Sequence, residues 1–221
     1  IMSWQIGNEP RAFATEALPA FERWLAEASA LIRQLDPNHL ISVGSEGAWG
    51  CENDYESYER ICADKNIDYC NIHIWPSNWS WVRKDHLQED LPEAYKLTKE
   101  YADRHLAICE RLGKPLVMEE FGYPRDGFKF SLSTPTRSRD EYYRYVFDLV
   151  ADNAERGGKF AGCNFWAWGG YARPRHVRWQ VGDPYTGDPA QEEQGLFAVF
   201  STDKTTLEVV RQHAKRMKNV K

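Results

Sequence analysis

Short apolar runs alternate along this chain with longer segments of helical periodicity. Residues 17–35 carry apolar side chains such as Phe21 and Leu25 at three- and four-residue intervals, which predicts an amphipathic helix. The apolar run from Leu116 to Met118 has the length and composition of a buried strand. The pattern therefore predicts strands and helices in alternation.

The same pattern along the whole sequence predicts strand–loop–helix units that repeat to the end of the chain. We expect strands at about residues 2–6, 39–44, 69–74, 115–120 and 160–168. We expect helices at about residues 17–35, 54–64, 92–112, 138–156 and 204–218. A long loop over 169–195 and a short apolar run at 196–200 precede the last helix. Such alternation is typical of a parallel sheet with crossover helices.

Two architectures share this pattern, an open doubly wound sheet and a closed (β/α)₈ TIM barrel. Chemically distinctive residues at or just after predicted strand ends favour the barrel, in which all strand C-termini face one mouth. These residues are Glu9, Glu46, His73, Glu119 or Glu120, and Trp166. No glycine-rich phosphate loop follows any strand. We expect the last five strands of the barrel, as the C-terminal portion of a single catalytic domain over 1–221, with about three units missing upstream.

The amino-acid composition argues against some classes of binding partner and favours sugars. The 221 residues carry a formal charge of −5 with both signs mixed, which argues against nucleic acid and anionic membrane surfaces. No apolar run approaches the roughly 20 residues of a membrane-spanning helix. The five cysteines are scattered, and we interpret them as small buried side chains rather than disulfides or metal ligands. Nine Trp are many for this length, and aromatic rings suit the apolar faces of sugars.

Two glutamates at strand ends are the candidate catalytic pair. Glu9 stands in Asn8-Glu9-Pro10, and Glu120 stands in Glu119-Glu120-Phe121-Gly122. Glycoside hydrolysis needs two such carboxyls, one to protonate the leaving oxygen and one to attack the anomeric carbon. A separation of about 5 to 5.5 Å gives retention of configuration, and roughly 6.5 to 9.5 Å gives inversion. This chemistry requires neither a metal nor a cofactor.

At this point the ordered motifs resemble a known family. Gly7-Asn-Glu-Pro10, His73-Ile-Trp75, Glu120-Phe-Gly122 and Phe165-Trp-Ala-Trp-Gly169 look like the last five strands of a glycoside hydrolase family 5 barrel. Within that family, Glu119-Glu120-Phe-Gly followed by Arg125-Asp-Gly, and the loop from Trp75 to Trp81, are similar to endo-β-1,4-mannanases. The resemblance covers nearly the whole chain.

The resemblance implies a role for each candidate residue. Glu9 would be the acid/base and Glu120 the nucleophile, while Asn8 would hold the sugar 2-hydroxyl. The remaining expected sugar-site residues are Arg11, Glu46, His73, Trp75 and Trp166.

More specific roles are expected for Trp166, Trp75 and three residues outside this set. Trp166 would lie under the sugar that is attacked, and Trp75 replaces a tyrosine of many members, so its indole donates one hydrogen bond but accepts none. Glu119 would point away from the mouth as a structural ion-pair partner. Arg125 and Asp126 would order their loop rather than touch substrate.

The sequence therefore predicts a retaining hydrolase of β-1,4-mannosidic bonds in mannan. Alternatives are a β-glucan endohydrolase or exo-β-mannosidase on the same fold, and a catalytically silent carbohydrate-binding barrel. We expect the missing barrel units as the protein's structural partner, and a secreted or periplasmic location, although no signal peptide is visible in this chain.

Overall fold

The computed structural model describes residues 1–220 and divides into two compact units. The first unit comprises Ile1–His73, Tyr101–Glu119 and Gly157–Gly162, and the second comprises Ile74–Glu100, Glu120–Arg156 and the residues from Cys163 onward. Each unit is therefore assembled from segments that are distant in sequence.

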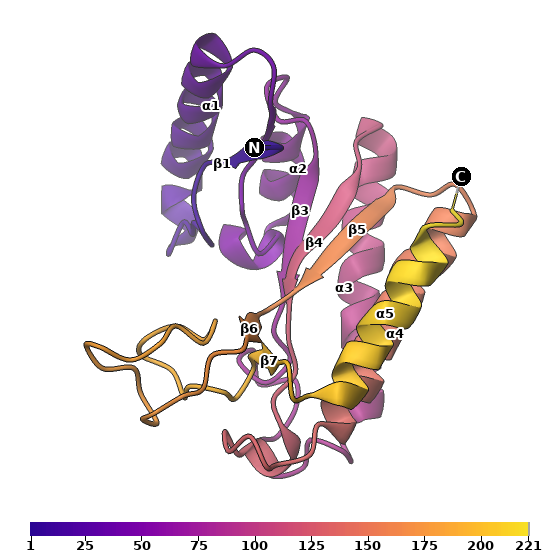
Figure 1. The fold of residues 1–221 in the computed structure, drawn as a ribbon. Coiled ribbons are helices and arrows are strands. Elements are labelled where there is room, and N and C mark those ends of the chain that lie inside the picture. The colour runs from indigo at the N-terminus through magenta and orange to yellow at the C-terminus, as the bar shows by residue number, and fades with distance from the viewer. Residues whose placement is uncertain (221) are drawn as a thin grey trace. The chain divides into compact units, whose positions relative to one another are not determined.

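Strands and helices alternate as the sequence predicts (Figure 1). The strands are β1 (Ser3–Gln5), β2 (Leu40–Ser42), β3 (Cys70–Ile74), β4 (Leu116–Phe121), β5 (Phe160–Phe165), β6 (Trp168–Gly170) and β7 (Val199–Phe200). The helices are α1 (Leu18–Leu35), α2 (Tyr55–Ala63), α3 (Leu91–Leu112), α4 (Arg137–Glu155) and α5 (Lys204–Met217). Each predicted helix is present with ends that differ from the prediction by about one residue.

In the first unit, β1 pairs with β2 in parallel, with Ser3 opposite Leu40 and Gln5 opposite Ser42. The pairing continues past β1, because the N–H groups of Ile6 and Gly7 donate to the carbonyls of Ser42 and Val43, respectively. Helix α1 covers this layer through its buried face, which includes Phe21. The register fixes where the chain leaves β1, and this is where Glu9 follows.

Strands β3, β4 and β5 form a second sheet in that order, and their arrows point the same way in Figure 1. All five residues of β3 are buried, as are most of those of β4. This burial agrees with the apolar run from Leu116 to Met118 in β4 and with the isoleucines of β3.

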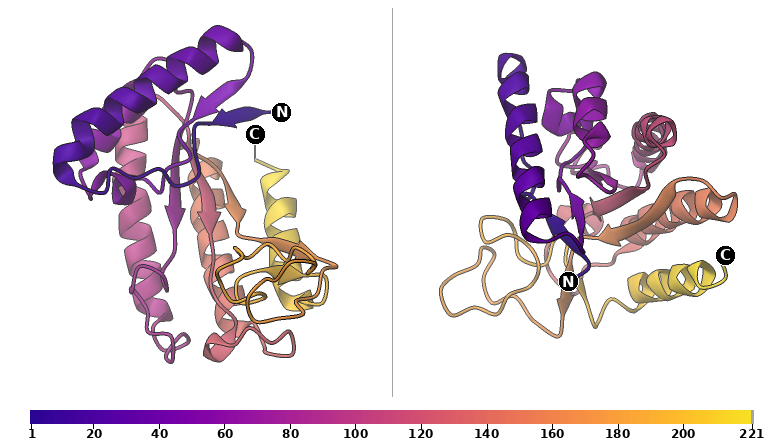
Figure 2. Two further views of the ribbon diagram at one scale, coloured as in Figure 1. Left: turned by 90° about the vertical axis from the view of Figure 1, so that its left-hand side faces the viewer. Right: turned by 90° about the horizontal axis from the view of Figure 1, so that it is seen from above.

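In the second unit, α5 lies along α4, as the views in Figure 2 also show. The carboxylate of Asp126 accepts hydrogen bonds from the first backbone N–H groups of α4, at Arg137 and Ser138. Arg125 is fully buried and donates to Asp203 at 2.6 Å. Both residues order their loop, which agrees with the expectation from the sequence.

One predicted element is wrong. The strand expected over 160–168 ends at Phe165, and a separate strand, β6, follows and pairs in parallel with β7. The N–H of Val199 donates to the carbonyl of Ala167 at 2.7 Å. Because the residues around Trp166 are apolar throughout, the sequence pattern cannot show that the chain changes its hydrogen-bonding partner there.

The cysteines and the helices agree with two further expectations from the sequence. The cysteines are free, and all except Cys163 are buried, as expected for small core side chains. Within residues 1–220, no helix combines the length and the apolar character that crossing a bilayer requires.

Candidate active site

Glu9 lies just beyond β1 with its backbone held by the chain that follows β2. Its N–H donates to the carbonyl of Gly44 at 2.9 Å, and its φ is +48°, which is uncommon for a residue with a side chain. Such a conformation persists only when its surroundings fix it, and the Gly44 bond does so. The side chain remains 24% exposed, so its carboxyl can meet a ligand.

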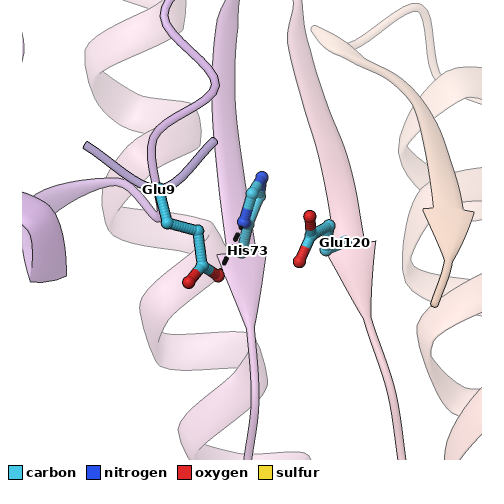
Figure 3. A group of neighbouring side chains, drawn as sticks. All are labelled: Glu9, His73 and Glu120. Carbon is cyan, nitrogen blue, oxygen red and sulfur yellow. Dashed lines mark hydrogen bonds and ion pairs between the residues drawn. The ribbon is translucent and has the colours of Figure 1, made fainter. Parts of the chain in front are cut away.

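His73, on β3, is the first partner of Glu9. Its Nδ1 lies 3.0 Å from Oε1 of Glu9 (Figure 3), and the ring is almost fully buried. The bond needs one proton, which Nδ1 donates when Glu9 is ionised and which Glu9 donates when it is protonated. This is the environment that an acid/base needs, because the carboxyl keeps a hydrogen bond in both protonation states.

Arg11 and Glu46 form the second contact of Glu9. Arg11 donates to the two oxygens of Glu46 from Nε at 2.6 Å and from Nη2 at 2.8 Å, a bidentate geometry. The same Nη2 lies 3.6 Å from Oε2 of Glu9. Burial raises the pKa of Glu46 above its ordinary value, although the Arg11 hydrogen bonds act in the opposite direction. The structure thus pairs these two expected sugar contacts with each other and leaves Arg11 as the more exposed one.

Helix α3 holds the loop that carries Glu46. The Tyr101 hydroxyl donates to the Glu46 carbonyl at 2.8 Å and accepts from the Trp49 N–H at 3.0 Å. His105 accepts from the Ala48 N–H at 2.9 Å through Nε2, so it is neutral, and burial lowers its pKa to about 3. The sequence does not reveal this pair, because a Tyr and a His on a helix face are ordinary core residues.

A glycine makes this approach possible. A Cβ at Gly47, whose φ is +98°, would lie 2.6 Å from His105 Nε2 and 2.8 Å from the Tyr101 hydroxyl oxygen. Only glycine can therefore bring the loop this close to α3.

Glu120 lies near the end of β4 and is the first residue of the Glu120–Arg156 segment of the second unit; Figure 3 marks it on that strand. It is 8% exposed. The next residue, Phe121, packs against Tyr143 and Phe147 of α4, with ring centroids 4.9 and 5.6 Å apart. Phe121 therefore anchors the strand on its helix-facing side, and this fixes the backbone on which Glu120 is carried.

The Glu-Phe-Gly motif ends in Gly122 because the Trp75 ring leaves no room for a side chain at this position. A Cβ there would lie 2.5 Å from the Trp75 ring, so a larger residue would displace that ring. Trp75 is buried and packs edge-on against Phe197, with centroids 5.3 Å apart. Phe197 follows the long loop and completes this contact, and nothing in the pattern of residues singles it out.

Glu119 differs from its prediction. It was expected to be an ion-pair partner, but among residues 1–220 its neighbours are hydroxyl groups, and no cation lies within ion-pair distance. Tyr69 donates to Oε1 at 2.9 Å and Ser42 donates to the same oxygen at 3.4 Å. Because Tyr69 and Ser42 are uncharged, neither charge patterning nor strand alternation could identify them.

The predicted site residues fall into two groups. The first unit brings together Glu9, Arg11, Glu46 and His73. The second unit contains Glu120, Trp75 and Trp166. Asn8 is exposed and makes no side-chain hydrogen bond among the described residues 1–220. The separation of the Glu9 and Glu120 carboxyls stays a prediction.

Comparison with known proteins identifies the family. All of residues 1–221 match the family model described as GH family 5 beta-mannosidase-like. The chain belongs to glycoside hydrolase family 5. A family 5 mannosidase from Rhizomucor miehei is 34% identical, with a TM-score of 0.84 over 99% of this chain and 51% of its own. An endo-β-1,4-mannanase from Thermotoga petrophila is 26% identical, with a TM-score of 0.68 over 99% of this chain and 44% of its own.

The curated relatives agree with these structures. Mannan endo-1,4-beta-mannosidase 2 of Oryza sativa subsp. japonica is 29% identical over 75% of this chain and 39% of its own length. This family 5 chain thus spans about two fifths to half of the relatives it matches. The family and its (β/α)₈ barrel fold, both predicted from the sequence, are confirmed, with this chain as part of the barrel.

Proposed function

We propose that this family 5 chain, within its completed barrel, hydrolyses β-1,4-mannosidic bonds in mannan-type polysaccharides with retention of configuration. The observation that carries the proposal is the setting of Glu9. Its partly exposed carboxyl is hydrogen-bonded to buried His73 and lies beside Arg11, so it keeps a partner whether it carries a proton or not. The names of the relatives supply the substrate class.

The first step forms a covalent intermediate. Glu9 donates its proton to the glycosidic oxygen while the Glu120 carboxylate attacks the anomeric carbon. The bond between that carbon and the oxygen breaks, and the leaving sugar departs with the proton as a hydroxyl group. Asn8 would hold the 2-hydroxyl of the attacked sugar, and Trp166 would lie beneath its ring.

The second step releases the sugar. The Glu9 carboxylate now accepts a proton from water, whose oxygen attacks the anomeric carbon, and Glu120 leaves as a carboxylate. Two inversions give net retention. The mechanism requires the two carboxyls about 5 to 5.5 Å apart.

An exo-acting β-mannosidase is the second candidate, and a specific observation favours it. The Rhizomucor structure, at 34% identity, is a mannosidase, whereas the curated endo-acting relative from rice is 29% identical. Endo cleavage lowers the viscosity of a soluble mannan early, while exo cleavage releases mannose with little change in viscosity. Viscometry together with product chromatography separates the two modes.

The experiment that tests the function compares mannan with cellulose as substrates for the completed enzyme. We expect reducing ends from mannan and a loss of at least about 10³-fold in rate for both Glu9→Gln and Glu120→Gln. Full activity in either variant would remove the mechanism, and faster cleavage of cellulose would move the substrate to β-glucan. A silent carbohydrate-binding barrel would bind mannan and release nothing.

We also propose that the enzyme is exported to a secreted or periplasmic location, because a polysaccharide substrate does not enter the cell. Fractionation of the source cells with an antibody against this chain tests this. Recovery in the cytosol alone would overturn it.

A further inference from the structure

The long loop between β6 and β7, drawn in Figure 1, contains an aromatic pair that lies outside the core. Tyr185 and Trp179 stack with centroids 5.5 Å apart and planes 13° from parallel. Tyr185 is nevertheless 82% exposed, so most of its ring meets water. A flat apolar ring with a hydroxyl tip, held at the surface, is the kind of side chain on which a sugar face can lie.

The pair is held by hydrogen bonds. Asp183 accepts from His176 Nδ1 at 2.9 Å and from the Gln180 N–H at 3.1 Å, and its carbonyl accepts from the Trp179 indole at 3.1 Å. The His176 hydrogen bond holds the pKa of Asp183 below its ordinary value, which favours the carboxylate form that accepts these bonds. Because the turn is fixed in advance, binding would cost little conformational entropy.

The residue after Tyr185 begins a second buried network. Thr186 donates to Gln194 at 2.7 Å, and Gln194 donates in turn to the Pro189 carbonyl at 2.7 Å. The buried Asp188 carboxylate accepts from the Gly195 N–H at 2.6 Å. Tyr185 is therefore fixed on one side by the Asp183 turn and on the other by this network.

A groove of about 760 Å³ is lined by residues that precede and follow Trp179 in the chain, although neither ring of the pair forms part of its lining. Its apolar lining includes Phe130, Leu132, Pro174 and Val177, and Arg178 and Gln180, on either side of Trp179, supply polar groups. Its volume is within the range of ligand sites. Apolar walls with hydrogen-bond donors at intervals fit a sugar chain, whose rings have apolar faces and hydroxyl rims.

Arg178 is the residue that links this groove to the rest of the unit. Its guanidinium makes no hydrogen bond or ion pair within residues 1–220, although it lines both the groove and a second pocket of about 400 Å³. Phe197 also lines that second pocket and packs on Trp75, which contacts Gly122 two residues after Glu120. The groove and the second pocket thus share Arg178, and the second pocket reaches Phe197, whose partner Trp75 lies against the segment that carries the proposed nucleophile.

We propose that Tyr185, Trp179 and the groove lined by Arg178 form an accessory binding surface for an uncharged β-1,4-linked mannan chain, outside the bond-cleaving site. The substrate class rests on the proposed function. The Tyr185 ring supports one sugar face, and the five N–H donors of Arg178 bind sugar hydroxyls along the chain. The surface holds a polymer that extends past the cleaved bond.

Affinity electrophoresis of the completed enzyme in native gels tests this, with soluble β-1,4-glucomannan in one gel and polygalacturonate in another. We expect glucomannan to retard the chain and Tyr185→Ala or Arg178→Gln to weaken binding about 3- to 10-fold. The matched control is Tyr171→Ala, because Tyr171 is 88% exposed in the same loop and stacks on no ring within residues 1–220. Circular dichroism and a thermal melt verify that each variant is folded.

The outcomes separate this inference from the proposed function. The gels are run in a Glu9→Gln, Glu120→Gln background, so retardation does not depend on cleavage. Retardation without hydrolysis by the completed enzyme would leave the surface and remove the function. Hydrolysis by the completed enzyme without retardation would support the proposed function and overturn the binding surface. Equal effects of Tyr185→Ala and Tyr171→Ala, or stronger retardation by polygalacturonate, would overturn the surface.

Discussion

The Arg11 guanidinium bridges two carboxylates, since its Nη2 lies 2.8 Å from Oε1 of Glu46 and 3.6 Å from Oε2 of Glu9. Glu46 is buried and Arg11 is partly exposed. Arg11 thus places a positive charge next to the proposed acid/base Glu9. The buried Glu46 carboxyl is the counter-ion of that charge.

Arg11→Met should destabilise the chain by about 2 kcal/mol at pH 7, because it leaves the Glu46 carboxyl buried without a partner. Burial already raises the pKa of Glu46 above its ordinary value, and loss of the Arg11 hydrogen bonds raises it further. A carboxyl with a raised folded-state pKa destabilises only as the pH rises past its unfolded value. The penalty should therefore nearly vanish at about pH 4. Urea unfolding at both pH values measures it, and an equal penalty at both would show that Glu46 is not the cause.

His105 should make stability fall on the acid side. Burial lowers its pKa to about 3 from an ordinary value of about 6.5, so between these values the unfolded state binds a proton that the folded state does not. Relative to pH 7.5, the wild type should lose about 2 kcal/mol at pH 5 from this group. His105→Gln keeps an acceptor for the Ala48 N–H and should show a flatter pH profile. Urea unfolding across this pH range measures both profiles, and an unchanged profile in His105→Gln would contradict this assignment.

Tyr69→Phe should cost about 1 to 3 kcal/mol, because it removes the stronger of the two donors to the buried Glu119. Glu119→Gln should cost less, since its amide oxygen can accept the same hydrogen bond. Chemical denaturation of the two variants makes the comparison. A larger cost for Glu119→Gln would mean that Glu119 has a cationic partner after all.

Asp203→Ala should destabilise the second unit by about 3 to 5 kcal/mol, because it leaves the fully buried Arg125 without its counter-ion. The matched control is Asp148→Ala, which removes an exposed carboxylate from the partly exposed Arg216, and there we expect less than about 1 kcal/mol. Differential scanning calorimetry of both variants measures the contrast. Similar melting temperatures for the two would contradict the assignment of Arg125 and Asp203 as a buried structural pair.

Gly122→Ala should cost about 1 to 3 kcal/mol and lower activity, because its Cβ meets the Trp75 ring at 2.5 Å. Gly162→Ala is the control, since a Cβ at Gly162, in β5, meets no atom within 4 Å. Activity and thermal unfolding are measured together. A harmless Gly122→Ala would show that Trp75 moves freely.

Most of the fold could be predicted because its signals are local. The helical spacing around Phe21 and Leu25 and the apolar run from Leu116 each depend on neighbours in sequence. The division after Phe165 depends instead on pairing between β6 and β7 across the long loop, and an apolar run contains no sign of it.

The site shows the same contrast. Glu9 and Glu120 could be singled out because a carboxyl at the end of an apolar strand is costly without a purpose. The partners that support them, such as Tyr101, His105 and Phe197, are ordinary core residue types. Only the folded chain shows what they hold in place.

The most direct test of the central claim is the anomeric configuration of the sugar azide formed when azide rescues each alanine variant of the completed enzyme on an activated aryl β-mannoside. If Glu9 is the acid/base, Glu9→Ala still forms the intermediate on Glu120, and azide attacks it to give the β-mannosyl azide. If Glu120 is the nucleophile, azide replaces it in Glu120→Ala and gives the α-mannosyl azide. The same anomer from both variants, or no rescue of either, would contradict these roles.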